Sequence, residues 1–155
     1  YLSWRVKRTL GHTFRFVELA NDVNEHMPLY VAGRVTDLLN RERKSVNGSN
    51  VLVLGLTYKR STSDWRESPS IPVVERLLAL GAEVRVCEPH LSSVDGPPVD
   101  VTFVEPTAEE FAAADIVVLL VDHPEFPLDT LAEHAPLILD TKGILRPRPF
   151  RGESL

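Results

Sequence analysis

Two apolar segments without polar alternation constrain the fold of this chain more than any other feature of its sequence. VLVLGL occupies residues 51–56 and IVVLLV occupies residues 116–121. A strand has this composition when both of its faces are buried, as in a parallel sheet covered by helices on both sides. Weaker strand patterns at residues 83–87, 101–104 and 137–139 are separated from these segments by stretches that favour helix. The alternation predicts an α/β fold with a Rossmann-like, doubly wound parallel sheet.

The residues at helix ends support this alternation. Ser68 and Pro69 suit the start of a helix, and Gly81 suits the left-handed position that follows its end. Thr107 and Glu110 have the spacing of a capping box at the start of a second, shorter helix. Both predicted helices therefore have a defined first turn.

A long amphipathic helix precedes the sheet. Apolar residues recur at steps of three or four between about residues 14 and 40. We expect Pro28 to kink this helix near residues 24–28 rather than to end it. An apolar face of this length predicts a homodimer, the alternative being that the helix folds back onto its own domain. The predicted dimer contacts are Val17, Ala20, Val23, Met27 and Val31.

Composition excludes several classes of protein. The chain has 155 residues, of which 25% are charged and 43% hydrophobic, as in a globular domain and unlike a disordered or fibrous chain. A net charge of −5 offers no basic surface for nucleic acid. The longest apolar segment is too short to span a membrane. We therefore expect a cytoplasmic protein with no nucleic-acid or membrane partner.

Cysteine and histidine usage argues against a disulfide and against a metal site. A single cysteine, Cys87, cannot form an intramolecular disulfide or a cysteine-built zinc site. It ends an apolar strand, where we expect a buried and unreactive thiol. The five histidines lack the spacing of zinc ligands, and we expect each at the surface or at a helix cap.

Charged residues gather where the predicted strands end. Ligands of parallel sheets bind at this edge, because helix N-termini point their free N–H groups at it. The first strand is followed by Lys59, Arg60 and Arg66, and the last by Lys142. Such a group of cations predicts a phosphate or pyrophosphate ligand. The first turn holds only Gly55, so the sequence lacks the glycine-rich dinucleotide fingerprint.

Residues 55–70, GLTYKRSTSDWRESPS, closely resemble the K-x-x-T-x-D-x-R-E-S-P loop of the UDP-glucose/GDP-mannose dehydrogenase family. Further segments resemble the same family, and the later ones look most like its UDP-N-acetylmannosamine dehydrogenase branch. These segments are residues 1–4, 18–31, 86–89, 121–126 and 140–143. The resemblance covers nearly the whole chain except its last ten residues.

The resemblance implies an enzyme of three parts: an N-terminal NAD-binding domain, a central helix, and a C-terminal domain that holds the UDP end of the substrate. Such enzymes oxidise the C6 alcohol of the sugar twice with two NAD, through a thioester on a cysteine. We expect residues 1–46 to be the C-terminal part of the central dimerisation helix region, residues 47–145 the UDP-binding α/β domain, and residues 146–155 a tail. Because the matching sequence contains neither the catalytic cysteine loop nor the NAD fingerprint, we expect a fragment without turnover of its own.

The resemblance also assigns roles to five residues of this sequence. Tyr58, Lys59 and Lys142 match positions that bind the UDP-sugar, and Arg66 matches the arginine that reaches the NAD pyrophosphate. Asp64 is expected to orient one of these cations. No residue of the chain is predicted to be catalytic or to bind a metal. UDP-N-acetylglucosamine or UDP-glucose as the substrate, and a stand-alone nucleotide-binding module without activity, are the alternatives.

Overall fold

The fold is a six-stranded parallel sheet with helices on both faces. The computed structural model describes residues 15–91 and 99–155, so the predicted similarity at residues 1–4 lies outside the described part. The strand order is β3-β2-β1-β4-β5-β6, with the reversal of winding between β1 and β4. This confirms the predicted doubly wound sheet. The strands are β1 (Asn50–Leu54), β2 (Glu83–Cys87), β3 (Thr102–Phe103), β4 (Ile116–Leu119), β5 (Ile138–Asp140) and β6 (Gly152–Ser154).

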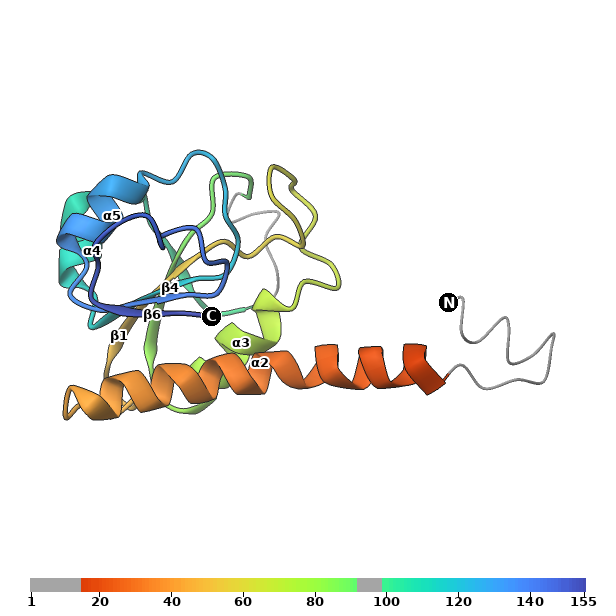
Figure 1. The fold of residues 1–155 in the computed structure, drawn as a ribbon. Coiled ribbons are helices and arrows are strands. Elements are labelled where there is room, and N and C mark those ends of the chain that lie inside the picture. Colours follow the sequence, from red (N-terminus) through yellow and green to blue (C-terminus); the bar gives the residue numbers. More distant parts are fainter. Residues whose placement is uncertain (1–14, 92–98) are drawn as a thin grey trace.

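Helices cover the two faces of the sheet in pairs. α2 (Arg15–Arg41) and α3 (Ser70–Ala79) lie on one side, and α4 (Ala108–Ala113) and α5 (Leu128–His134) lie on the other (Figure 1). Each face has its own apolar core, one containing α2 and α3 side chains and the other containing Phe111 and Leu131. All four residues of β4 are buried, which is why this strand shows no alternation of polar residues.

The predicted end of α3 and the Thr107 cap of α4 are present, but both helix starts differ from the prediction. α3 begins at Ser70 with Pro69 at the N-cap, one residue later than predicted. At α4 the capping box is incomplete, because the Thr107 N–H donates to the Glu105 carbonyl and the Glu110 carboxylate pairs with Arg85. Gly81 has φ of 85°, and its N–H donates to the Leu78 carbonyl while the Ala82 N–H donates to the Leu77 carbonyl. This is the hydrogen-bond pattern of a Schellman motif. Thr107 Oγ1 accepts from the Glu110 N–H at 3.3 Å at the start of α4.

α2 has two halves with different surroundings. It continues through Pro28 without interruption, as predicted. The kink expected near residues 24–28 is not seen, since Figure 1 shows α2 as one nearly straight helix. Its second half packs in the core beside α3, with Val35 and Leu39 fully buried. Its first half extends beyond the α/β body and leaves Phe16 81% exposed. Val31, a predicted dimer contact, is only 6% exposed and belongs to the chain's own core, so that assignment is wrong.

The last ten residues contain a strand that the sequence pattern did not indicate. β6 pairs in parallel with β5 at the edge of the sheet. Glu153 on this strand accepts hydrogen bonds from the Arg34 guanidinium on α2, with Arg34 Nε 2.9 Å from Glu153 Oε1. A three-residue edge strand is too short to show a periodic pattern, and its pairing depends on a neighbour already in place. In the described part of the chain, no helix combines the length and the apolar character that crossing a membrane requires.

Candidate functional site

Four loops meet at the carboxyl edge of the sheet, the edge at which the parallel strands end. The last residues of β1 and β2 pair as Leu54 and Cys87, and those of β1 and β4 as Leu54 and Leu119. Leu119 pairs in turn with Asp140, the last residue of β5. The loops after these four strands therefore begin side by side, as the sequence predicted.

A buried polar network lies beneath these loops. Glu88 follows β2 and His123 follows β4, and neither side chain is exposed to solvent. His123 Nε2 lies 3.2 Å from Glu88 Oε2 and 3.0 Å from Thr57 Oγ1. Glu88 Oε2 also accepts from the Leu56 and Thr57 N–H groups at 2.7 and 3.1 Å. Three segments that are distant in sequence are thus joined by hydrogen bonds.

The contacts determine the charge state and tautomer of this pair. The Ser61 N–H donates to His123 Nδ1 at 3.2 Å, so Nδ1 must be the unprotonated nitrogen and Nε2 must carry the proton. Burial acts to raise the pKa of Glu88, but hydrogen bonds from His123, Leu56 and His90 outweigh it and lower that pKa below its ordinary value. The pair is therefore a Glu88 carboxylate that accepts from a neutral imidazole.

The loop after β1 carries four of the predicted site residues. Tyr58 is half-exposed, and Lys59 Nζ lies 5.3 Å from the centroid of its ring. The Tyr58 N–H donates to the Asp64 carbonyl at 2.7 Å, which closes the loop. Arg66 Nε and Nη2 donate to the two oxygens of the Asp64 carboxylate at 2.9 and 3.1 Å. The structure therefore pairs Asp64 with Arg66, whereas Lys59 stands apart from both.

A groove of about 960 Å³ runs between the first half of α2 and this loop. Tyr58 and Lys59 line it together with Trp65 and Glu67, and α2 contributes Asn24 among its lining residues. The groove brings the predicted substrate residues against the helix that precedes the domain. Its lining includes neither Lys142 nor Arg66.

Lys142 lies at the same edge of the sheet, in the loop after β5. Its side chain is exposed, and its N–H donates to Asp140 Oδ1 at 2.9 Å. The buried Asp140 carboxylate also accepts from the N–H groups of Gly143 and Leu145 at 2.9 and 2.8 Å. Asp140 thus shapes the turn that presents Lys142. β4 separates this turn from the loop of Lys59, and the roles of both lysines stay predictions.

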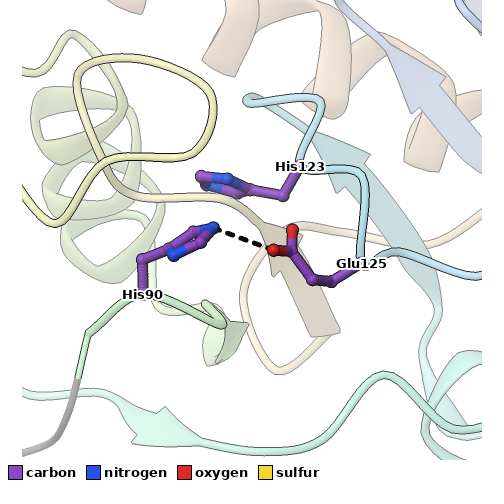
Figure 2. A group of neighbouring side chains, drawn as sticks. All are labelled: His90, His123 and Glu125. Atoms are coloured by element: carbon purple, nitrogen blue, oxygen red, sulfur yellow. Dashed lines mark ion pairs between the residues drawn. The ribbon is translucent and has the colours of Figure 1, made fainter.

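His90, His123 and Glu125 have the composition of a metal site. Their possible ligand atoms lie within 4.8 Å of one another, and the three side chains converge in Figure 2. His90 Nε2 is 3.3 Å from Glu125 Oε1, an ion-pair distance. Both nitrogens of His123 already form hydrogen bonds, so a metal would have to displace Ser61 or Glu88 from that ring. The hydrogen bonds account for His123 without a metal.

The burial of His123 corrects one expectation from the sequence. It is 2% exposed and packs edge-on against Phe126, so it is neither a surface histidine nor a helix cap. Sequence reasoning placed Glu88 and His123 at strand ends but missed their contact. The available signal was that Glu88 and His123 each stand within a few residues of the end of a strand, and that these strands lie on either side of β1.

Cys87 fits its predicted structural role. Its side chain is fully buried at the end of β2, and burial raises the pKa of the Cys87 thiol to about 12. A thiol with this pKa is not a nucleophile near neutral pH.

Comparisons with known proteins find similarity over most of the chain. Residues 52–147 match the model described as the UDP-glucose/GDP-mannose dehydrogenase family, UDP binding domain. The chain is 34% identical to an NDP-N-acetyl-D-galactosaminuronic acid dehydrogenase of Ralstonia solanacearum, covering 91% of the chain and 33% of the relative. It is 32% identical to a UDP-N-acetyl-D-mannosamine dehydrogenase of Methanococcus maripaludis, covering 84% of the chain and 31% of the relative. The chain thus spans about a third of the length of these relatives.

Solved structures show the same similarity. The UDP-N-acetylmannosamine dehydrogenase of Pyrococcus horikoshii superposes with a TM-score of 0.73 at 25% identity, covering 94% of this chain and 35% of that one. A UDP-glucose dehydrogenase of Pyrobaculum islandicum superposes with a TM-score of 0.72 at 28% identity, covering 88% of this chain and 31% of that one. The fold and the order of its elements are therefore shared with nucleotide-sugar dehydrogenases.

Proposed function

The chain belongs to the UDP-glucose/GDP-mannose dehydrogenase family, and we propose that it supplies the UDP-binding part of an NAD-dependent nucleotide-sugar 6-dehydrogenase. In this proposal residues 47–145 form the UDP-binding domain and residues 1–46 the end of a central helix region. The chain covers 33% of the length of its relative from Ralstonia solanacearum, and in this proposal the complete reaction requires further parts of the enzyme.

One observation carries the proposal: Tyr58 and Lys59 are exposed at the carboxyl edge of the sheet and line the groove beside α2. A lysine ammonium supplies a point charge for a diphosphate, and an aromatic ring offers a flat apolar face to a nucleoside base. Neither side chain takes part in the buried network below the loop, so both can face a ligand. Lys142, at the end of β5, supplies a second cation at the same edge.

The proposed substrate is a UDP-linked N-acetylated hexosamine, with UDP-N-acetylmannosamine as the first candidate. Several relatives are named as UDP-N-acetyl-D-mannosamine dehydrogenases. A second candidate is the N-acetylgalactosamine equivalent, favoured by the 34% identical relative from Ralstonia solanacearum. The product would be the corresponding uronic acid, and its use would be in polysaccharide biosynthesis. A cytoplasmic location fits this use of NAD and a nucleotide sugar.

NAD, when bound, supplies the hydride acceptor for the oxidation. Arg66 has an exposed guanidinium that Asp64 holds by two hydrogen bonds, so it fits a contact to the NAD pyrophosphate from this domain. The glycine-rich turn that binds a dinucleotide is absent from the sequence. We therefore propose that another part of the enzyme holds most of the cofactor, and that this chain alone produces no NADH from any UDP-sugar.

The exposed half of α2 is the proposed dimer contact. Of the predicted contacts on this half, Val23 and Met27 are exposed and Val17 and Ala20 are half-buried. Phe16 and Leu19 are further exposed large apolar residues there, and such a surface marks an interface. Sedimentation at tens of micromolar should show a dimer that becomes a monomer when Val23 and Met27 are replaced by aspartate. A compact monomer in the unmodified chain would contradict the proposal.

Titration of the chain with UDP, followed by NMR, tests the binding function. We expect Lys59→Ala to weaken UDP binding by about tenfold, because it removes a charge-assisted contact. Arg76→Ala is the matched control, since Arg76 is an exposed cation in the last turn of α3, at the far end from the loop. Uridine should bind both variants alike, because it has no diphosphate. UDP affinity that is equal in the two variants would contradict the role of Lys59.

A further inference from the structure

We infer that Glu88 and His123 are positioning residues that hold the loop of residues 56–61 in the shape that presents Tyr58 and Lys59. The ligand side of this inference rests on the proposed function, since it assumes that these two side chains bind UDP. The holding of the loop itself follows from the buried network. The inferred role does not include contact with a ligand, because the side chains of Glu88 and His123 are fully buried.

Glu88 holds the beginning of the loop. Its Oε2 accepts from the N–H groups of Leu56 and Thr57 at 2.7 and 3.1 Å, and its Oε1 accepts from the His90 N–H at 3.0 Å. Within the part of the chain that the structure describes, each hydrogen-bond partner of this carboxylate is a donor. An ionised carboxylate accepts at both oxygens, whereas an amide would turn an NH₂ group toward one set of these donors. The site is therefore matched to a glutamate.

His123 holds the end of the same loop. Its Nδ1 accepts from the Ser61 N–H at 3.2 Å, and its protonated Nε2 faces Glu88 and Thr57. The Thr57 hydroxyl donates in turn to the Lys59 carbonyl at 3.1 Å. Glu88 and His123 thus contact the loop at residues 56, 57 and 61, and the Thr57 hydroxyl extends the network to the carbonyl of residue 59. The exposed side chains of Tyr58 and Lys59 lie between residues 57 and 61.

The backbone at Ser61 shows why the loop needs such support. Its φ is 55°, in the left-handed region that a residue with a side chain seldom adopts. Conformations of this kind persist only where neighbouring contacts determine them. The hydrogen bond from the Ser61 N–H to His123 is such a contact, and it closes the turn immediately after Lys59.

Hydrogen exchange of single backbone amides, measured by NMR on the whole chain, tests the positioning directly. In His123→Phe we expect the Ser61 amide to exchange about tenfold faster, because it loses its acceptor. The Val53 amide, inside β1, should be unchanged. Glu125→Gln is the matched control, because Glu125 contacts His90 in the same cluster without contacting the loop.

A second pair of variants avoids reliance on one buried substitution. Thr57→Val removes the hydroxyl that links His123 to the Lys59 carbonyl, and Thr57→Ser restores it. We expect faster exchange of the Ser61 amide in Thr57→Val and recovery in Thr57→Ser. A merely space-filling role of Thr57 predicts the reverse order, because valine keeps the volume and serine does not.

UDP affinity separates this inference from the proposed function. If the loop keeps its shape in only about a tenth of the molecules, the apparent affinity of UDP falls about tenfold, and we expect this loss in His123→Phe and Thr57→Val. Unchanged exchange of the Ser61 amide in both variants would overturn the positioning role. If the Ser61 amide exchanges faster in these variants but the unmodified chain does not bind UDP, the positioning role is supported and the proposed function is overturned.

Discussion

Replacing Gly55 by alanine tests how closely the ends of β1 and β4 must approach to bring the site together. Gly55 follows β1 with φ of 91°, and its N–H donates to the Cys87 carbonyl at 3.0 Å. A Cβ at this position would lie 2.4 Å from Val121 Cβ and 2.9 Å from the Val121 backbone nitrogen. The contact is with backbone as well as side chain, so no simple rotation of Val121 relieves it.

Two effects contribute to the loss of stability. An L-residue in the left-handed region costs about 1–2 kcal/mol, and inserting a methyl group into a fully packed position costs about 1–3 kcal/mol. We therefore expect Gly55→Ala to lower the free energy of unfolding by about 2–5 kcal/mol. Proteins of this kind are stable by about 5–15 kcal/mol, so the variant should still fold.

Gly48→Ala separates the two effects. Gly48 has φ of 79°, close to that of Gly55, but a Cβ there would meet nothing within 4 Å. It should lose only the backbone contribution of about 1–2 kcal/mol. Urea unfolding of both variants at 25 °C gives the two free energies, and equal m-values would show that the unfolded states are comparable. Equal losses in the two variants would refute the close approach of Gly55 to Val121 as the cause.

Three further predictions concern stability and reactivity. A thiol reagent at about pH 8 should modify Cys87 only as fast as the chain opens, because the thiol is buried and its pKa is raised to about 12; rapid labelling of the folded chain would contradict this. Leu39 is buried in the core and Leu29 is exposed. Leu39→Ala should therefore lower the free energy of unfolding by about 2–5 kcal/mol, whereas Leu29→Ala should change it by less than about 0.5 kcal/mol. Urea unfolding of the two variants compares these values. The folded-state pKa of Glu88 is lowered, so the ionised carboxylate stabilises the folded state fully above the unfolded-state pKa of about 4.3. This stabilisation is lost as the pH falls through the folded-state pKa. Glu88→Gln should therefore be less stable than the unmodified chain near neutral pH, and its stability should decline less on acidification.

Local patterns in the sequence were sufficient for much of the fold. The buried strands β1 and β4 appear as apolar runs, because both of their faces are covered. Gly81 and Thr107 mark helix ends, because their effects act within one turn of the chain. The loop at residues 55–70 was identified by its residue order alone. In each case the physical cause lies within a few residues of the pattern.

Tertiary structure decided what these patterns could not show. Glu88 and His123 are far in sequence from the loop residues that they contact: Glu88 is 31 residues from Thr57, and His123 is 62 residues from Ser61. Whether a polar residue after a strand faces water or a buried neighbour depends on which strands lie beside it, and the strand order places β2 and β4 on either side of β1. Tertiary structure also decided the surroundings of α2. Its apolar periodicity is continuous and does not reveal that only its second half packs in the core. A sequence determines which side chains prefer burial, but the neighbours that satisfy their hydrogen bonds are selected only when the whole chain has folded.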